Sequence, residues 1–115
     1  KDYSGLKFKN ITPTDIDGFI EIQNKVFIFL ELKTGDTDLP WGQELALVRL
    51  RDAIKQPALL IIATHQHPVN EDIDAANCIV VKYKYGEKWH NANPGEIVKN
   101  LIDRFLIMNN LADYT

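Results

Sequence analysis

Cysteine is almost absent from this chain of 115 residues, which contains only Cys78. A single thiol excludes an intrachain disulfide framework, and its position in an apolar run favours a reduced side chain in the core. No apolar run approaches the length that crosses a membrane, and no signal peptide is visible. Together these absences predict an intracellular protein of the cytoplasm without a membrane partner.

Positive charge is also scarce, because 13 Lys and Arg stand against 16 Asp and Glu, which gives a net charge of −3. This balance argues against broad electrostatic affinity for nucleic acid, although local basic patches remain compatible with it. The sequence also contains no Gly-rich phosphate loop, no nucleophile elbow and no Cys-based zinc ligand set. Any chemistry must therefore come from another pattern.

What the sequence does contain is 45% hydrophobic residues, enough for one core and a single domain over residues 1–115. Extended apolar runs predict five strands: Leu6–Ile11, Gly18–Ile22, Val26–Lys33, Ala58–Thr64 and Asn77–Tyr85. Helical periodicity predicts two helices: Trp41–Lys55, and a second from the N-cap Asn93 and Pro94 to Met108. The segments Thr34–Pro40 and Gln66–Ala75 are polar and are expected to be loops.

The second and third strands are expected to form a hairpin, because only Gln23-Asn24-Lys25 separates them. A turn of these three residues pairs Ile22 with Val26. Counting back along both strands then places Asp17 opposite Glu31. Side chains alternate with a period of two, so Glu31 and Lys33 lie on one face of the sheet.

A strand, a crossover helix and another strand follow this hairpin, and that order predicts parallel pairing with a right-handed connection. The chain is therefore expected to be an α/β protein with a central mixed sheet flanked by helices in three layers. The carboxyl ends of the parallel strands and the start of the Asp17 strand would share one edge of the sheet. Open α/β sheets bind ligands at such edges.

Acidic groups at this edge suit a hard divalent cation, because Mg²⁺ takes oxygen ligands from one or two carboxylates and from water. Asp17, Glu31 and the backbone carbonyl of Leu32 are candidate ligands. Lys33 is placed to orient a water molecule or to offset negative charge in a transition state. The pattern therefore points to metal-assisted phosphodiester cleavage.

At these residues the sequence resembles the PD-(D/E)xK nuclease superfamily, which has the restriction-endonuclease-like fold. The signature of that family is an acidic residue at the start of one core strand and Glu-x-Lys near the end of the next. Glu31-Leu32-Lys33 matches the second half, and Asp17 matches the first, with Asp15 as the competing assignment. Many members carry a glutamine near the start of the next helix, where Gln43 stands.

The resemblance covers roughly residues 6 to 64 and implies an endonuclease acting on DNA with Mg²⁺, or Mn²⁺ as a substitute. It implies that Asp17 and Glu31 bind the metal, that Lys33 and Gln43 belong to the catalytic group, and that Asp15 is a second ligand or an outer partner. A homodimer or a larger nucleic-acid-processing complex fits this class. Many members have an acidic helix before the first strand; here that acid is expected from elsewhere or from a preceding segment.

Two other interpretations remain open. A catalytically silent module with the nuclease fold would bind nucleic acid or a protein partner at the same edge. A small structural or assembly protein would carry the hairpin charges as a solvated face, with Lys33 paired to Asp15 or Glu31 for about 0.2 to 1 kcal/mol. Against that last interpretation, the third strand is apolar on both faces except at Glu31, and a carboxylate there is costly without a partner or a metal.

Overall fold

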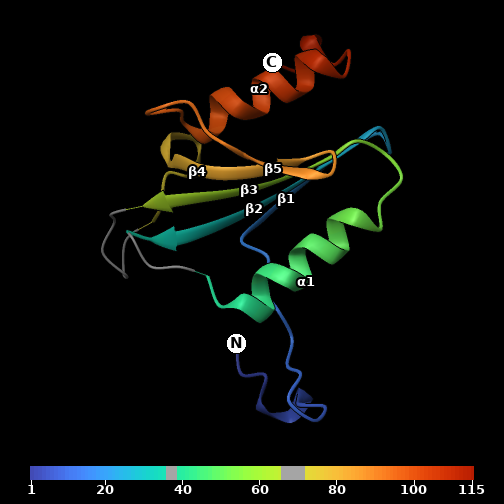
Figure 1. The fold of residues 1–115 in the computed structure, drawn as a ribbon, viewed down its shortest axis with the longest axis vertical. Helices are drawn as coiled ribbons and strands as arrows, with labels where there is room; N and C mark the ends of the chain where they lie inside the picture. Colours follow the sequence, from blue (N-terminus) through green and yellow to red (C-terminus); the bar gives the residue numbers. More distant parts are fainter. Residues whose placement is uncertain (36–38, 66–71) are drawn as a thin grey trace.

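The computed structural model describes residues 1–35, 39–65 and 72–115. Within these residues, a five-stranded mixed sheet has α1 on one face and α2 on the other (Figure 1). The elements are the strands β1 (Gly18–Ile22), β2 (Val26–Thr34), β3 (Ala58–His65), β4 (Ile79–Tyr85) and β5 (Lys88–Asn91), and the helices α1 (Trp41–Asp52) and α2 (Val98–Met108). The predicted α/β class, with three layers and a mixed sheet, is confirmed.

The β1/β2 hairpin has the predicted register. Ile22 pairs with Val26, and the antiparallel ladder continues to Gly18 opposite Leu30. Both Gln23 and Asn24 have positive φ angles, of 48° and 57°, as a tight turn between twisted strands requires. One step before β1 begins, Asp17 lies level with Glu31 by continuation of this register.

β2 and β3 are parallel and joined through α1, as predicted, with Lys33 level with Thr64 near their carboxyl ends. β3 and β4 are antiparallel, and β5 closes the far side of the sheet in the order β1-β2-β3-β4-β5. The beginning of β1 therefore shares one end of the sheet with the carboxyl ends of β2 and β3. This is the end at which the sequence places the acidic residues.

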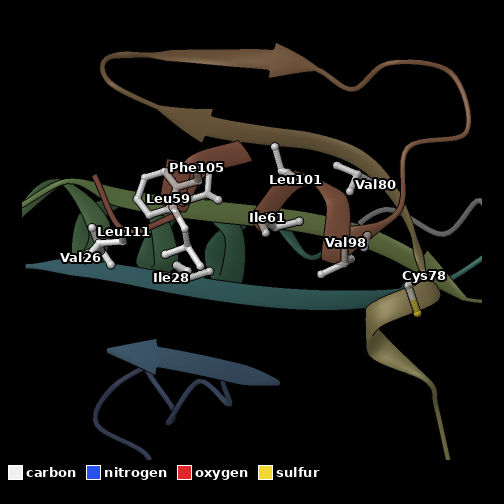
Figure 2. Close-up of a cluster of buried hydrophobic side chains, with 12 residues drawn as sticks. Val26, Ile28, Leu59, Ile61, Cys78, Val80, Val98, Leu101, Phe105 and Leu111 are labelled. Carbon is white, nitrogen blue, oxygen red and sulfur yellow. The ribbon is translucent and has the colours of Figure 1, made fainter. Parts of the chain in front are cut away.

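The α2 face of the sheet is filled by a continuous apolar core. Figure 2 shows this layer, in which side chains from β2, β3 and β4 meet those of α2. The buried residues are Val26, Ile28, Leu59, Ile61, Ala63, Cys78, Val80, Val98, Leu101, Phe105, Leu106 and Leu111. The single thiol is thus a buried member of the core, as predicted.

The α1 face has a smaller apolar cluster and carries charge. Phe29, Leu60 and Ile62 from the sheet pack with Leu47 of α1. Three charged residues are also buried among the described residues, namely Glu31, Arg51 and Lys84. Each of them comes from α1 or from a strand position that faces it.

Four features differ from the prediction. The segment Leu6–Ile11 is not a strand, because it contains only a bridge between Phe8 and Ile11, with Lys9 at a φ of 57° between them. The alternation of apolar residues with Lys7 and Lys9 imitates a strand, but no neighbouring strand pairs with it within the described residues.

The second helix begins later than predicted. Glu96 N–H donates to the carbonyl of Asn93, and Gly95 has a φ of 73°, so Asn93 and Pro94 belong to a turn before the bridge at Ile97 instead of capping the helix. The first helix ends at Asp52, before the predicted Lys55.

The strand β5 was not predicted, because Lys88–Asn91 has only one large apolar side chain. Parts of the predicted loops Thr34–Pro40 and Gln66–Ala75 lie outside the described residues. In the described part of the chain, neither helix has both the length and the apolar character of a membrane span.

Candidate functional site

A cleft of about 830 Å³ opens at the acidic end of the sheet, between α1 and the N-terminal segment. Its walls include Asp17, Glu31 and Leu32 from the hairpin, with Gly42 and Gln43 from the first turn of α1. The cleft exists because β1 begins only at Gly18, opposite Leu30, while the antiparallel β2 continues to Thr34. The last part of β2 therefore has no neighbouring strand on that side among the described residues.

Glu31 lies at the floor of this cleft and is only 3% exposed. Its Oε1 atom accepts a hydrogen bond of 2.7 Å from the side-chain amide of Gln43. Among the described residues, its buried Oε2 atom has no hydrogen-bond partner of good geometry. A buried carboxylate oxygen without a donor is costly, so this atom calls for a proton or a cation.

Burial raises the pKa of the Glu31 carboxyl to about 8, and the negative charge of Asp17 acts in the same direction. Hydrogen bonding from the backbone of Asp17, and then from the side chain of Gln43, opposes the shift by stabilising the ionised form. Glu31 in the metal-free protein therefore keeps its proton through neutral pH. A divalent cation beside it would compete with that proton.

Asp17 is held beside Glu31 by the backbone of β2. Its Oδ2 atom accepts a 2.7 Å hydrogen bond from the N–H of Leu32. The N–H and C=O of one strand residue point to the same side of the strand, so the Leu32 carbonyl also faces the side of Asp17. The three predicted ligand groups, Asp17, Glu31 and the Leu32 carbonyl, are thus brought to one place.

Gln43 reaches Glu31 because it belongs to the stripe of α1 that faces the sheet. Gln43, Leu47 and Arg51 are four residues apart and lie on one side of the helix. Leu47 enters the apolar cluster, and Arg51 Nε donates to the carbonyl of Ala58 at 3.0 Å. These two anchors fix the helix at its middle and its end, and so fix Gln43 in its first turn.

Asp15 lines the same cleft, but its carboxylate is engaged elsewhere. It accepts a hydrogen bond of 2.7 Å from the Tyr3 hydroxyl and lies 3.2 Å from Lys1 Nζ. The hydrogen bond with Tyr3 is the first cause of the lowered pKa of Asp15. In the structure, the Asp15 carboxylate is therefore joined to the N-terminal segment.

Lys33 shares the α1 face of β2 with Glu31 but lines a neighbouring groove instead of the cleft. In the described part of the chain, no ion pair joins Lys33 to Asp15 or Glu31. Its ammonium is therefore not held by the surface pairs that the structural interpretation expected.

The donor set fits a hard cation that keeps much of its water. No group of three or more His, Cys, Asp or Glu side chains within the described residues could hold a metal ion. Two carboxylates and a carbonyl do match the protein share of a Mg²⁺ site, in which waters and substrate oxygens complete the shell. The buried Oε2 atom of Glu31 is the specific group that such an ion would satisfy.

Two cleft residues were not anticipated from the sequence. Tyr3 lines the cleft from the N-terminal segment, and Arg49 lines it from α1. Arg49 follows Leu45 and Ala46, which also line the cleft, by four and three residues, and it is exposed. Helical spacing could have suggested Arg49, whereas nothing in the sequence indicates that the N-terminal segment folds back toward Asp15.

Comparisons with known proteins give no relative for this chain: no family model matches it, and neither a curated protein nor a solved structure was found to be similar.

Proposed function

We propose that this protein is a divalent-metal-dependent nuclease that hydrolyses phosphodiester bonds of DNA. The observation that carries the proposal is the buried Oε2 atom of Glu31, which has no donor of good geometry among the described residues and lies beside the second carboxylate, Asp17. Such a pair of adjacent carboxylates contributes little to the stability of the fold by itself. Mg²⁺, or Mn²⁺ in its place, is the cofactor that suits these oxygens.

In this proposal, Asp17, Glu31 and the carbonyl of Leu32 hold the metal, which when bound lowers the pKa of a water and stabilises charge on the phosphate. The backbone N–H of Leu32 orients Asp17, and the amide of Gln43 orients Glu31. Both donors leave the second oxygen of their carboxylate available. Gln43 is thus a positioning residue, since its described contact is with Glu31.

Lys33 supplies positive charge next to the cleft in this proposal. It follows Glu31 by two residues on the same face, so its Cα lies about 7 Å further along the strand. From there its side chain can reach a phosphate oxygen or an attacking water at the cleft. Asp15 has no direct role, because Tyr3 and Lys1 hold its carboxylate.

One observation favours the second candidate function, a silent nuclease-fold module that binds nucleic acid or a protein. Lys33 borders the neighbouring groove and not the cleft itself. If the lysine stays there when a substrate binds, metal and nucleic acid would bind without cleavage.

The proposal is tested by calorimetric titration with Mg²⁺ and Mn²⁺ beside a cleavage assay on single-stranded, double-stranded and branched DNA. We expect the parent to bind one ion and to cleave, and Asp17→Asn and Glu31→Gln to lose both properties. Glu87→Gln, at the exposed β4/β5 turn, is the matched control and should behave as the parent. Metal binding without cleavage by the parent would favour the silent module, and absence of metal binding would reject the nuclease.

A further inference from the structure

A second hollow of about 340 Å³ lies beside the cleft, on the same face of the sheet. We call it the lysine groove. Its lining residues are Lys33, Leu39, Trp41, Glu44, Ile62, Val81 and Lys82. Leu39 lines both hollows, and the first turn of α1 stands between them, with Trp41 and Glu44 facing the groove and Gly42 and Gln43 facing the cleft. The two hollows therefore adjoin at Leu39.

The lysine groove is locally positive in a chain whose net charge is −3. Its lining contains Lys33 and Lys82 against the single carboxylate of Glu44, which gives a formal charge of +1. Lys82 is already placed, because its Nζ atom lies 2.5 Å from Glu44 Oε1 and 4.4 Å from the centre of the Trp89 ring. Lys33 has no ion pair within the described residues.

The two tryptophans of the chain have different surroundings near this groove. Trp89 is half-buried, packs against the apolar cluster under α1 and lies beneath Lys82. Trp41 is 77% exposed, although indole rings are usually buried over most of their area. An exposed ring beside two lysines and an apolar floor is the combination that binds unpaired nucleotides, through base stacking and contacts to phosphate.

We propose that the lysine groove receives unpaired nucleotides of the DNA strand whose phosphate enters the cleft, with a base stacked on Trp41. Lys82 and Lys33 face the backbone of that strand. This inference rests on the proposed nuclease function and gives it a substrate class, namely single strands or duplexes with an unpaired segment. Stacking on Trp41 requires a free base face, which a continuous duplex covers with the neighbouring pairs.

The test measures the affinity of the 115-residue chain for a labelled 12-nucleotide DNA strand and for the matching 12-base-pair duplex, by fluorescence anisotropy in EDTA. Chelation removes metal-dependent cleavage, so the anisotropy reports the binding of an intact strand. We expect the parent to prefer the single strand and Trp41→Ala to weaken that binding about tenfold, while the duplex changes little. Trp41→Phe keeps a ring and should restore most of the affinity.

Two further variants separate stacking from charge. Lys82→Gln should weaken the single strand and reduce the dependence of its affinity on salt by about one phosphate contact. Trp89→Phe, with circular dichroism to verify the fold, leaves Trp41 as the only indole, so quenching of its fluorescence by the strand reports stacking directly. Unchanged fluorescence, or equal losses for strand and duplex in Trp41→Ala, would overturn the inference.

Failure of the groove proposal can be distinguished from failure of the nuclease proposal. If calorimetry shows a bound Mn²⁺ ion while Trp41→Ala binds the single strand as the parent does, the groove proposal fails and the nuclease proposal stands. If Trp41→Ala loses the strand while no metal binds, the nuclease proposal fails and the groove proposal survives as strand binding alone. A matched RNA strand that binds more tightly than the DNA strand would overturn the assignment to DNA.

Discussion

Ile28 and Phe29 are neighbours in β2, yet their side chains enter different layers of the molecule. Ile28 packs into the apolar core beneath α2, and the described charged residues of that side include the ion pair of Glu96 with Arg104 of α2. Phe29 lies under α1, in the layer that also buries Glu31, Arg51 and Lys84. The same strands thus build an apolar core on the α2 face and bury charged side chains on the α1 face.

The way the two helices are fastened explains this difference. α2 buries four apolar side chains, from Val98 to Leu106, whereas α1 buries only Leu47 and Arg51. α1 is joined to β4 by ion pairs of Glu44 with Lys82 and of Asp52 with Lys84. Because polar contacts hold α1, the side chain of Gln43 in its first turn can contact the Glu31 carboxylate without interrupting an apolar core.

The largest expected effect on stability comes from the α2 face. Phe105 is 2% exposed and contacts Tyr85 edge-on, with ring centres 5.6 Å apart. Phe105→Ala should lower the free energy of unfolding by about 3–5 kcal/mol, through lost burial and the cavity left behind. Urea unfolding measures this loss. Ile107→Ala, on the exposed side of the same helix, should cost less than about 1 kcal/mol; equal losses would contradict the division between the faces.

On the α1 face, a substitution of Glu31 should change the free energy of unfolding in the opposite direction, by raising it. The folded protein holds the Glu31 proton with a pKa of about 8, whereas glutamate in an unfolded chain titrates near 4.3. Folding thus favours the protonated form, so the contribution of this group is complete below about pH 4 and is lost as the pH rises to about 8. Above that range the folded metal-free protein carries an ionised, buried carboxylate beside Asp17.

We therefore expect Glu31→Gln to raise the free energy of unfolding of the metal-free protein by a few kcal/mol at pH 8.5, and to change it little at pH 4.5. The neutral amide keeps the acceptor for Gln43 and removes the charge. Urea titrations at the two pH values, with Glu87→Gln as an exposed control, measure the difference. A variant that is less stable than the parent at pH 8.5 would show that the Glu31 charge is compensated without a metal.

The hairpin was predictable because two local rules agree. The apolar runs fix the strands, and the turn of three residues fixes the register, so the positions of Asp17 and Glu31 followed by counting. The side to which Glu31 points followed from alternation alone. These are short-range effects, and they specify the centre of the candidate site.

The remaining parts depend on contacts between distant segments. Asp15 was considered as a ligand, and its carboxylate accepts a hydrogen bond from Tyr3, which is 12 positions away in the chain. Lys33 was expected at the cleft, whereas it lines the neighbouring groove, because the first turn of α1 stands between the two hollows. Neither the N-terminal segment nor the start of α1 has a periodic pattern that reports these positions, so the sequence could not supply them.

A smaller effect on stability is expected at Lys84, a buried charge of the α1 face whose ion pair attaches α1 to the sheet. Lys84 is 8% exposed, and its Nζ atom lies 3.4 Å from Oδ2 of Asp52, whose Oδ1 atom lies 2.8 Å from the guanidinium of Arg51. Lys84→Met should change the free energy of unfolding by no more than about 1 kcal/mol, because Arg51 still pairs with Asp52 and the apolar stem is kept. Thermal unfolding measures this, and a loss above about 3 kcal/mol would make the ion pairs essential for the attachment of α1.

The smallest effect on stability is expected at Lys33, where the effect on turnover should be large. Its side chain is half-buried, without an ion pair in the described part of the chain, so Lys33→Ala should change the free energy of unfolding by less than about 0.5 kcal/mol. The variant should also keep its affinity for Mg²⁺ or Mn²⁺, because Lys33 is not among the proposed ligands and its loss removes a competing cation. If Lys33 stabilises the transition state, the cleavage rate should nevertheless fall by a factor of about 100 or more. Calorimetric metal titration, urea unfolding and single-turnover cleavage on one preparation give the three readings together. Unchanged cleavage would remove Lys33 from the mechanism, and lost metal affinity would place it at the ion; only retained binding with lost turnover assigns the lysine of the charged face to the chemical step.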